Sequence, residues 1–393
     1  MKKFDFKADA EKRNEYLVAI RRELHRFPGV GFDVPKTCAI IERELDAMGI
    51  EHTREYGPLS VVAEIGPRGN VPVIAFRADM DALPVEEKTG LPFASEHPGN
   101  MHACGHDAHM ASALGAARSL KPIENELPFR LRLVFQPSEE GAVSGAKMMV
   151  ENGVLEGVDY VLCQRVAGEV DVGKVAYVTG AACSACAPIE ITFHGKSSHA
   201  TLPHRGSDAL AMLFKTYSGI QLMLSREVDP FEKIVCSVGA VNGGHVHNII
   251  CDKANMKITL RTFNMELNDF VIDRIRMLAE NAAAELGGTV DFDAYVSAPA
   301  VVNSEFLADC LKNAANTVLG EGNSYVCNPR MSSDDFSWFS GQKPSLYYWP
   351  GVRNLDKYHE TALHNNDFML DEDALLIGEN LLIATLYEIA EKA

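Results

Sequence analysis

The chain lacks any long apolar segment and any excess of positive charge. No stretch of its 393 residues approaches the roughly 18 apolar residues of a membrane-spanning helix. The opening residues, MKKFDFKADAEKR, contain no apolar core of signal-peptide length. Lys and Arg total 37 against 54 Asp and Glu, which gives a formal net charge of −17. This balance argues against nucleic acid and against an anionic membrane surface as partners.

A disulfide framework is also absent. The nine cysteines are odd in number and scattered without regular spacing, which fits a reducing compartment better than a disulfide scaffold. We therefore expect a cytoplasmic protein. Its length suits two domains, and its 47% hydrophobic content supplies an ample core.

Helical and strand patterns alternate through the first half of the chain. Helical periodicity covers residues 9–27 and 37–50, and a further helix is expected at 108–120. Strand patterns cover 60–66, 71–81 and 129–138. Because these strands are almost continuously apolar and helices separate them, the predicted fold class is α/β, with a mixed, mostly parallel sheet between helices.

The pattern changes from about Ala187. Strands and helices then follow the order β-α-β-β-α-β as far as residue 297, which predicts a small ferredoxin-like α+β domain. After it the chain returns to mixed helix and strand. We therefore expect residues 1–186 and 298–393 to be two segments of one larger domain, with 187–297 inserted between them.

HACGHDAH, residues 102–109, concentrates metal-ligand chemistry in one short stretch. Cys104 and His106 offer a thiolate and an imidazole, which are good ligands for zinc-like metals. Gly105 between them predicts a turn, and Asp107 is expected to cap the helix that follows. The alternative interpretation is a polar loop with a buried cysteine.

FQPSEEG places Glu139 and Glu140 directly after an apolar strand. One carboxylate could bind a metal ion while its neighbour acts as general base toward metal-bound water. Asp79 and Asp81, at the end of another strand, could orient a histidine ligand. Solvated glutamates on a turn and capping by the aspartates are the alternatives.

Three polar residues further along the chain suit substrate binding. His199 lies beside serines in a glycine-bounded turn and could donate a hydrogen bond to a developing oxyanion. Asn248 and Arg261 offer an amide and a guanidinium suited to a substrate carboxylate. A structural histidine and an arginine on a solvated strand face are the alternatives.

Taken together, these stretches resemble the M20 metallopeptidase superfamily, specifically its amidohydrolase branch of N-acyl-amino-acid, hippurate and indole-acetyl-amino-acid hydrolases. The resemblance spans essentially the whole chain. It rests on RADMDALP, HACGHDAH, FQPSEEG, GKSSHATLPH, HNII, SSDDFSWF and ALHNNDF, which come in the family's order and spacing. It implies a zinc-peptidase-like catalytic domain with two metal ions, interrupted by a ferredoxin-like lid domain that dimerises.

The resemblance also implies roles for particular residues. Glu139 matches the general base, and His199 resembles the lid histidine that reaches a partner subunit's active site. Asn248 and Arg261 resemble residues that hold the substrate's carboxylate. The implied metal ligands are Cys104, His106, Glu140 and His364, the last in preference to the nearby His359. One or two divalent ions per subunit are expected, and Zn, Mn, Ni and Co are all compatible with these ligands.

One position departs from the family pattern in a way that bears on the metal. Arg165 stands where the family usually shows a histidine ligand, and a guanidinium has no lone pair to donate. Either the site holds a single metal ion with the charge of Arg165 near the second position, or His102 or His109 supplies a replacement. Asp334 is a lesser departure, since the family often has glutamate there.

The expected activity is metal-dependent cleavage of an N-acyl group from an amino acid with a free carboxylate, by a homodimer formed through the lid domain. A dipeptidase or carboxypeptidase acting at the same site is one alternative. A catalytically degenerate protein that binds amino-acid derivatives is another, and Arg165 favours it.

Overall fold

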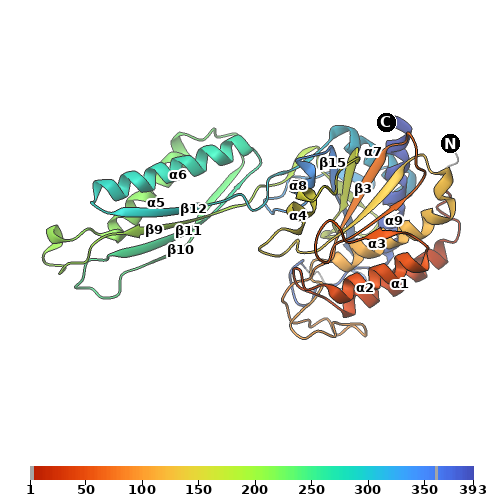
Figure 1. The fold of residues 1–393 in the computed structure, drawn as a ribbon, viewed down its shortest axis with the longest axis horizontal. Helices are drawn as coiled ribbons and strands as arrows, with labels where there is room; N and C mark the ends of the chain where they lie inside the picture. The colour runs from red at the N-terminus through yellow and green to blue at the C-terminus, as the bar shows by residue number, and fades with distance from the viewer. Residues whose placement is uncertain (1–3, 359–361) are drawn as a thin grey trace. The chain divides into compact units, whose positions relative to one another are not determined.

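The computed structural model describes residues 4–358 and 362–393, and the chain divides into two compact units (Figure 1). Unit 1 contains residues 1–182, 301–329 and 334–393. Unit 2 contains Cys183–Ala300 and Arg330–Ser333. The segment predicted to be inserted, residues 187–297, lies within unit 2.

A mixed sheet of nine strands forms the centre of unit 1 within the described residues. Its order is β1-β2-β4-β3-β5-β15-β7-β14, and β6 pairs with β15. The adjacent strands β4, β3, β5 and β15 are parallel to one another, whereas β2 and β7 pair antiparallel with β4 and β15. The predicted mixed, mostly parallel sheet is confirmed. The strands are β1 (His52–Thr53), β2 (Val61–Ile65), β3 (Val73–Asp79), β4 (Arg130–Gln136), β5 (Tyr160–Gln164), β6 (Ala167–Asp171), β7 (Val175–Tyr177), β14 (Ser324–Val326) and β15 (Ser345–Arg353); β8 (Gly180–Cys183) and β13 (Val301–Asn303) form a separate pair.

The helices of unit 1 pack against this sheet and against each other. Helix α3 is almost entirely buried. Its run of small residues permits close approach: a side chain at Gly115 would meet Cδ2 of Leu17 in α1 at 2.5 Å. No helix in the described part of the chain combines the length and apolar character needed to cross a bilayer. The helices are α1 (Ala10–Arg26), α2 (Pro35–Ala47), α3 (His106–Leu120), α4 (Gly145–Glu151), α7 (Glu305–Leu319), α8 (Ser337–Ser340) and α9 (Asp373–Lys392), with a 3-10 turn at Lys121–Glu126.

Unit 2 is a four-stranded antiparallel sheet, in the order β10-β11-β9-β12, with two helices. Along the chain its elements follow β9, α5, β10, β11, α6, β12, so the predicted ferredoxin-like order is confirmed. Both helices begin at a side-chain cap: Asp208 accepts from Leu210 N, and Asn264 accepts from Glu266 N. The elements are β9 (Ala187–His194), α5 (Ala209–Arg226), β10 (Ile234–Gly243), β11 (Lys253–Thr262), α6 (Met265–Glu285) and β12 (Thr289–Ala294).

Candidate metal centre and active site

The topology of unit 1 brings several predicted site residues to one edge of its sheet. Strands β4, β3, β5 and β15 are parallel neighbours, so their carboxyl ends meet at the same edge, where α/β folds build their sites. Asp79 is the last residue of β3. The segments that directly follow β4 and β5 carry Glu139, Glu140 and Arg165.

The loop before α3 is held close to the segment that follows β5. Gly105 has a φ of 75°, and a Cβ there would meet Cγ2 of Val166 at 2.4 Å, so only glycine fits this turn. Helix α3 begins at the next residue, His106, whose side chain is 1% exposed. Its Nδ1 donates to the carbonyl oxygen of Asp81 at 2.7 Å, which leaves Nε2 with the lone pair and directs it into the cluster.

The prediction that Asp107 caps α3 is wrong. Gly105 occupies the N-cap position, and Asp107 lies inside the first helical turn, fully buried. Its Oδ2 accepts from Nε of Arg21 at 2.7 Å and lies 2.7 Å from Nδ1 of His25. A buried carboxylate needs such partners, and the arginine lowers the pKa of Asp107 against the opposing effect of burial.

Asp81 explains why two glutamates stand side by side. Its Oδ1 accepts from the backbone N–H of Glu139 and its Oδ2 from that of Glu140, both at 3.0 Å. The turn is tight, since the preceding Ser138 has a φ of 55°. The sequence suggested Asp81 only as a possible partner of a histidine side chain. Its role in holding the paired glutamates depends on a contact between two loops that no local pattern signals.

The carboxylate of Glu139 points into the cluster without a hydrogen-bond partner. Its side chain is 6% exposed, and Oε2 is buried and forms no hydrogen bond with any described residue. That oxygen lies 3.6 Å from Nε2 of His106 and 3.6 Å from NH1 of Arg165. Burial raises the pKa of Glu139 well above its ordinary value.

Three possible metal-ligand atoms, from Cys104, Glu140 and His364, lie close together. Nε2 of His364 lies 3.2 Å from Sγ of Cys104 and 3.3 Å from Oε1 of Glu140. Burial alone would raise the pKa of Glu140, but contact with His364 and His106 outweighs it and lowers the pKa to about 2. His364 adopts a φ of 66°, and its backbone N–H donates to Ala103 O at 2.8 Å, which ties it to the loop of Cys104. His359 lies outside the described residues.

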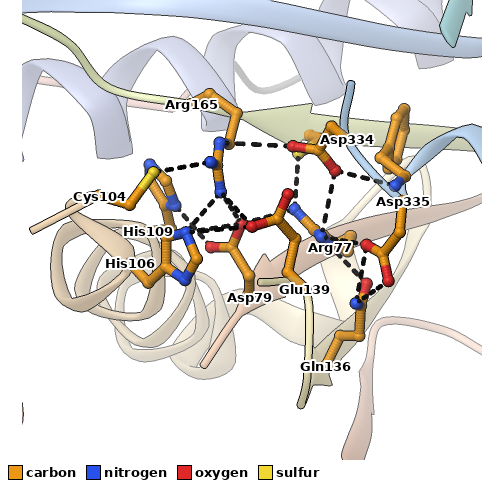
Figure 2. Close-up of polar contacts among 12 residues, drawn as sticks. Arg77, Asp79, Cys104, His106, His109, Gln136, Glu139, Arg165, Asp334 and Asp335 are labelled. Atoms are coloured by element: carbon orange, nitrogen blue, oxygen red, sulfur yellow. Dashed lines mark hydrogen bonds and ion pairs between the residues drawn. The ribbon is translucent and has the colours of Figure 1, made fainter. Parts of the chain in front are cut away.

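Figure 2 shows Arg165 in polar contact with several of the surrounding side chains, among them Cys104, Asp79 and Asp334. Its NH2 donates to Sγ of Cys104 at 2.9 Å, and its NH1 lies 2.6 Å from Nε2 of His106. NH1 also donates to Oδ2 of Asp79, and Nε lies 3.4 Å from Oδ2 of Asp334. The residue is 8% exposed, so the structure buries this guanidinium among carboxylates, an imidazole and a thiol.

His102 and His109 were the two histidines considered as replacement ligands. Neither belongs to the group of possible metal ligands that contains Cys104. His109 donates from Nδ1 to Oδ1 of Asp79 at 2.6 Å, and its Nε2 accepts from the backbone N–H of Val166 at 2.9 Å. Burial lowers the pKa of His109 to about 4, in keeping with a neutral ring that accepts at Nε2. Both ring nitrogens of His102 are buried without a hydrogen-bond partner among the described residues. His102 belongs to none of the possible groups of metal ligands found among those residues. In this structure both ring nitrogens of His109 are therefore occupied by hydrogen bonds.

Arg77 is a site residue that sequence reasoning missed. It is fully buried in β3, and its guanidinium donates to Asp79 at 2.6 Å, to Gln136 at 2.7 Å and to Asp335 at 2.8 Å (Figure 2). It thereby joins the ends of β3 and β4 to the segment before α8. The available signal was an arginine within a buried strand, VIAFRAD, whose other residues before the terminal aspartate are apolar.

The predicted substrate-binding residues all belong to unit 2. His199 and Asn248 are exposed neighbours: His199 pairs with Ile249 in an isolated bridge, and Ala200 N donates to Asn248 O at 3.0 Å. Nδ1 of His199 accepts from Oγ1 of Thr201 at 2.8 Å or from its backbone N–H at 3.2 Å, which leaves Nε2 free of hydrogen bonds within the described residues. Arg261, on β11, donates to Oγ of Ser333 at 2.8 Å and forms no ion pair with any described residue.

Comparison with known proteins places the chain among hydrolases. The sequence profile of peptidase family M20/M25/M40 matches residues 75–388. An N-acetyl-L-cysteine deacetylase of Bacillus subtilis (strain 168) is 34% identical over 96% of this chain and 88% of its own length. A thermostable carboxypeptidase of Saccharolobus solfataricus is 32% identical over 95% of both chains. The crystal structure of a Bacillus subtilis protein, described as a dinuclear metal binding peptidase from the M20 family, superposes with a TM-score of 0.85 at 31% identity over 98% of this chain and 100% of that one. The resemblance noted from the motifs is therefore confirmed, and the chain belongs to peptidase family M20/M25/M40 and is a hydrolase.

Proposed function

We propose that the protein is a metal-dependent amidohydrolase that removes the acyl group from N-acyl amino acids. The observation that carries this proposal is the position of Glu139. Its carboxylate is buried, lacks a hydrogen-bond partner at Oε2, and lies 3.6 Å from the imidazole Nε2 of His106 and close to the carboxylates of Asp334 and Asp335. Such a group is suited to accept a proton from a water molecule beside a divalent ion.

The donor atoms of Cys104, Glu140 and His364 fit a divalent ion. Bond lengths of about 2.0–2.3 Å to a tetrahedral ion place ligand atoms roughly 3.3–3.7 Å apart. The separations from His364 Nε2, 3.2 Å to Cys104 Sγ and 3.3 Å to Glu140 Oε1, are close to that range, and Oε1 is buried without a hydrogen bond. A thiolate, an imidazole and a carboxylate suit Zn, Mn, Ni or Co. When bound, the ion would polarise the amide carbonyl and lower the pKa of water.

The remaining chemistry belongs to the protein's own side chains. Glu139 would take the proton of the attacking water and deliver it to the leaving nitrogen. Asp81 would keep this carboxylate in place, because it fixes the backbone on both sides of the Glu139–Glu140 peptide bond. Burial raises the pKa of Glu139 well above its ordinary value, which makes its carboxylate a stronger base than an exposed one.

Unit 2 is proposed to bind the substrate. His199 has a free Nε2 and would donate to the oxyanion that develops on the amide oxygen. Arg261, which has no carboxylate partner among the described residues, and Asn248 would bind the substrate's carboxylate. This local cation would offset the formal charge of −17, which otherwise repels an anionic substrate.

We further propose that the protein is a homodimer formed through unit 2, with His199 serving the site of the partner subunit. The long strand β10 lies at the edge of its sheet and exposes Val241, at 49%. Such an edge is a template for pairing with a second copy. The nine cysteines are scattered without the regular spacing of a disulfide framework, which supports the cytoplasm as the compartment.

The test is release of free amino acid from a substrate panel. Purified protein supplied with Zn, Mn, Ni or Co would be given N-acetyl and N-benzoyl amino acids, simple dipeptides, and N-acyl amino acid amides that lack the carboxylate. We expect turnover of the first group and loss of turnover when the carboxylate is amidated. Absence of turnover with every acyl amino acid and every metal would refute the proposal.

A dipeptidase or carboxypeptidase is the second candidate, favoured by the similarity to the carboxypeptidase of Saccharolobus solfataricus. It predicts that dipeptides are cleaved faster than acetyl and benzoyl amino acids in the same panel. A degenerate binding protein is the third, favoured by the contacts of Arg165 with Cys104 and His106. It predicts binding of acyl amino acids without turnover.

A further inference from the structure

The guanidinium of Arg165 occupies a place where two sets of possible metal ligands meet. Within the described residues, one set contains Asp79, His106 and His109, and another contains Cys104, His106 and Glu140. His106 is common to both sets. Arg165 contacts Asp79, His106 and Cys104 at once, so it lies against both (Figure 2).

The contacts of Arg165 use the lone pairs that a metal ion would need. His106 donates from Nδ1 to a carbonyl oxygen, so its only available lone pair is on Nε2, and NH1 of Arg165 lies 2.6 Å from that atom. His109 has no lone pair left, because Nε2 already accepts from Val166 N. Asp79 accepts from Arg77, Arg165 and His109. An ion in this set would find the ring nitrogens of both histidines already in polar contacts and three acceptor sites of Asp79 in use.

Steric overlap and charge repulsion both oppose the binding of a metal ion to His106 while Arg165 is in place. A metal ion bonds to a histidine nitrogen at about 2.0–2.1 Å, which would place it on top of the NH1 group that now faces Nε2 of His106. Two positive charges would also lie within bonding distance of each other in a buried site, where their repulsion is weakly screened. The guanidinium cannot lose its charge to relieve this conflict.

Two members of the second set, Cys104 and Glu140, together with His364 retain the lone pairs that one ion requires. Cys104 bonds to Arg165 through one N–H, but a thiolate sulfur has further lone pairs. Neither Glu140 nor His364 is hydrogen-bonded to Arg165 within the described residues. Oε1 of Glu140 and Nε2 of His364 lie 3.3 Å apart, and the same Nε2 lies 3.2 Å from Sγ of Cys104.

We propose that Arg165 is a fixed internal cation in the place of one of two metal ions, so that each chain binds a single divalent ion on Cys104, Glu140 and His364. This rests on the proposed hydrolase function, and it distinguishes the chain from the relative described as a dinuclear metal binding peptidase. Arg165 neutralises Asp79 and fixes the unused lone pair of His106. It is a positioning residue: it holds the cluster in shape whether or not the ion is bound.

The test is the number of ions per chain in the full-length protein. Wild type, Arg165→His and Arg165→Gln would be stripped with a chelator, loaded with Mn²⁺ alone, dialysed, and measured by inductively coupled plasma mass spectrometry. We expect one ion per chain in wild type, two in R165H, and one in R165Q, which removes the charge without supplying an imidazole. R165Q is therefore the matched control for the added ligand.

Electron paramagnetic resonance gives a readout that does not depend on activity. Wild type should give the spectrum of isolated Mn²⁺, and R165H that of a magnetically coupled pair. If R165H does not fold, the stoichiometry and spectrum of wild type still decide: two ions or a coupled pair overturns the inference. One ion in both wild type and R165H also overturns it, while leaving the hydrolase intact. No ion in wild type, together with no turnover, contradicts the proposed function itself.

Discussion

Oδ2 of Asp334 lies 3.4 Å from Nε of Arg165, so the aspartate and the arginine that stand where the motifs led us to expect a glutamate and a histidine face each other. The same oxygen accepts from the hydroxyl of Tyr347 at 2.8 Å, and Asp334 is 3% exposed. Arginine is longer than histidine, and aspartate is shorter than glutamate by one methylene. We infer that the lengths of these two side chains fit each other.

This relationship predicts coupled effects on stability. In metal-free protein, D334E alone should destabilise the fold by about 1–3 kcal/mol, because an extra methylene in a packed site forces a shift. Combined with R165H, the same change should cost less, with a coupling energy of about 0.5–3 kcal/mol. Urea unfolding of wild type, both single variants and the double variant measures this. Strictly additive effects would show that the pair is independent.

Glu139→Gln tests the general base. The substitution keeps the shape of the side chain but removes its ability to take a proton, so kcat should fall by roughly 10²–10⁴. Bound metal per chain should stay unchanged, since Glu139 is not among the proposed ligands. Glu151→Gln, at an exposed position in α4, is the matched control and should retain wild-type kcat. Loss of metal in E139Q would instead make Glu139 a ligand.

Asp81→Asn tests the anchor of the paired glutamates. The amide nitrogen of asparagine cannot accept a hydrogen bond, so one of the two bonds to the backbone N–H groups of Glu139 and Glu140 must be lost. Metal affinity should fall by roughly 10–100-fold, the usual effect of removing a residue that orients a ligand. Isothermal titration with Mn²⁺ measures it. Unchanged affinity, in a variant that folds normally, would show that the loop does not need this anchor.

Arg77→Met tests the buried charge network. Asp79 and Asp335 would each lose a buried cationic partner, which costs about 3–5 kcal/mol of unfolding free energy. The control is Arg54→Met, which breaks an ion pair with Glu42 that is far more exposed and should cost no more than about 1 kcal/mol. Denaturant unfolding of both variants compares the two. Equal effects would contradict the role given to Arg77.

The fold was largely predictable because local patterns dominate it. The helix expected at 9–27 is α1, and the strand expected at 129–138 contains β4. The parallel sheet followed from apolar strands separated by helices, and the sequence placed polar residues at the ends of the strands that are now β3 and β4. These inferences needed only periodicity and topology.

The contacts within the site were not predictable in the same way. Asp107 looks like a helix cap in the sequence, but its partners Arg21 and His25 lie more than eighty positions earlier in the chain. Asp81 and Glu139 meet only because two loops converge at one sheet edge. The position of Arg165 was visible from the motif, but its bonds to Cys104 and His106 required the folded chain.

The most direct test is an anomalous diffraction map from crystals of the wild-type protein grown with Mn²⁺ or Zn²⁺. We predict one peak per chain, bounded by Sγ of Cys104, Oε1 of Glu140 and Nε2 of His364, with the carboxylate of Glu139 facing it and the guanidinium of Arg165 in place beside it. A second peak at the position of that guanidinium, or a single peak remote from Glu139, would contradict the account.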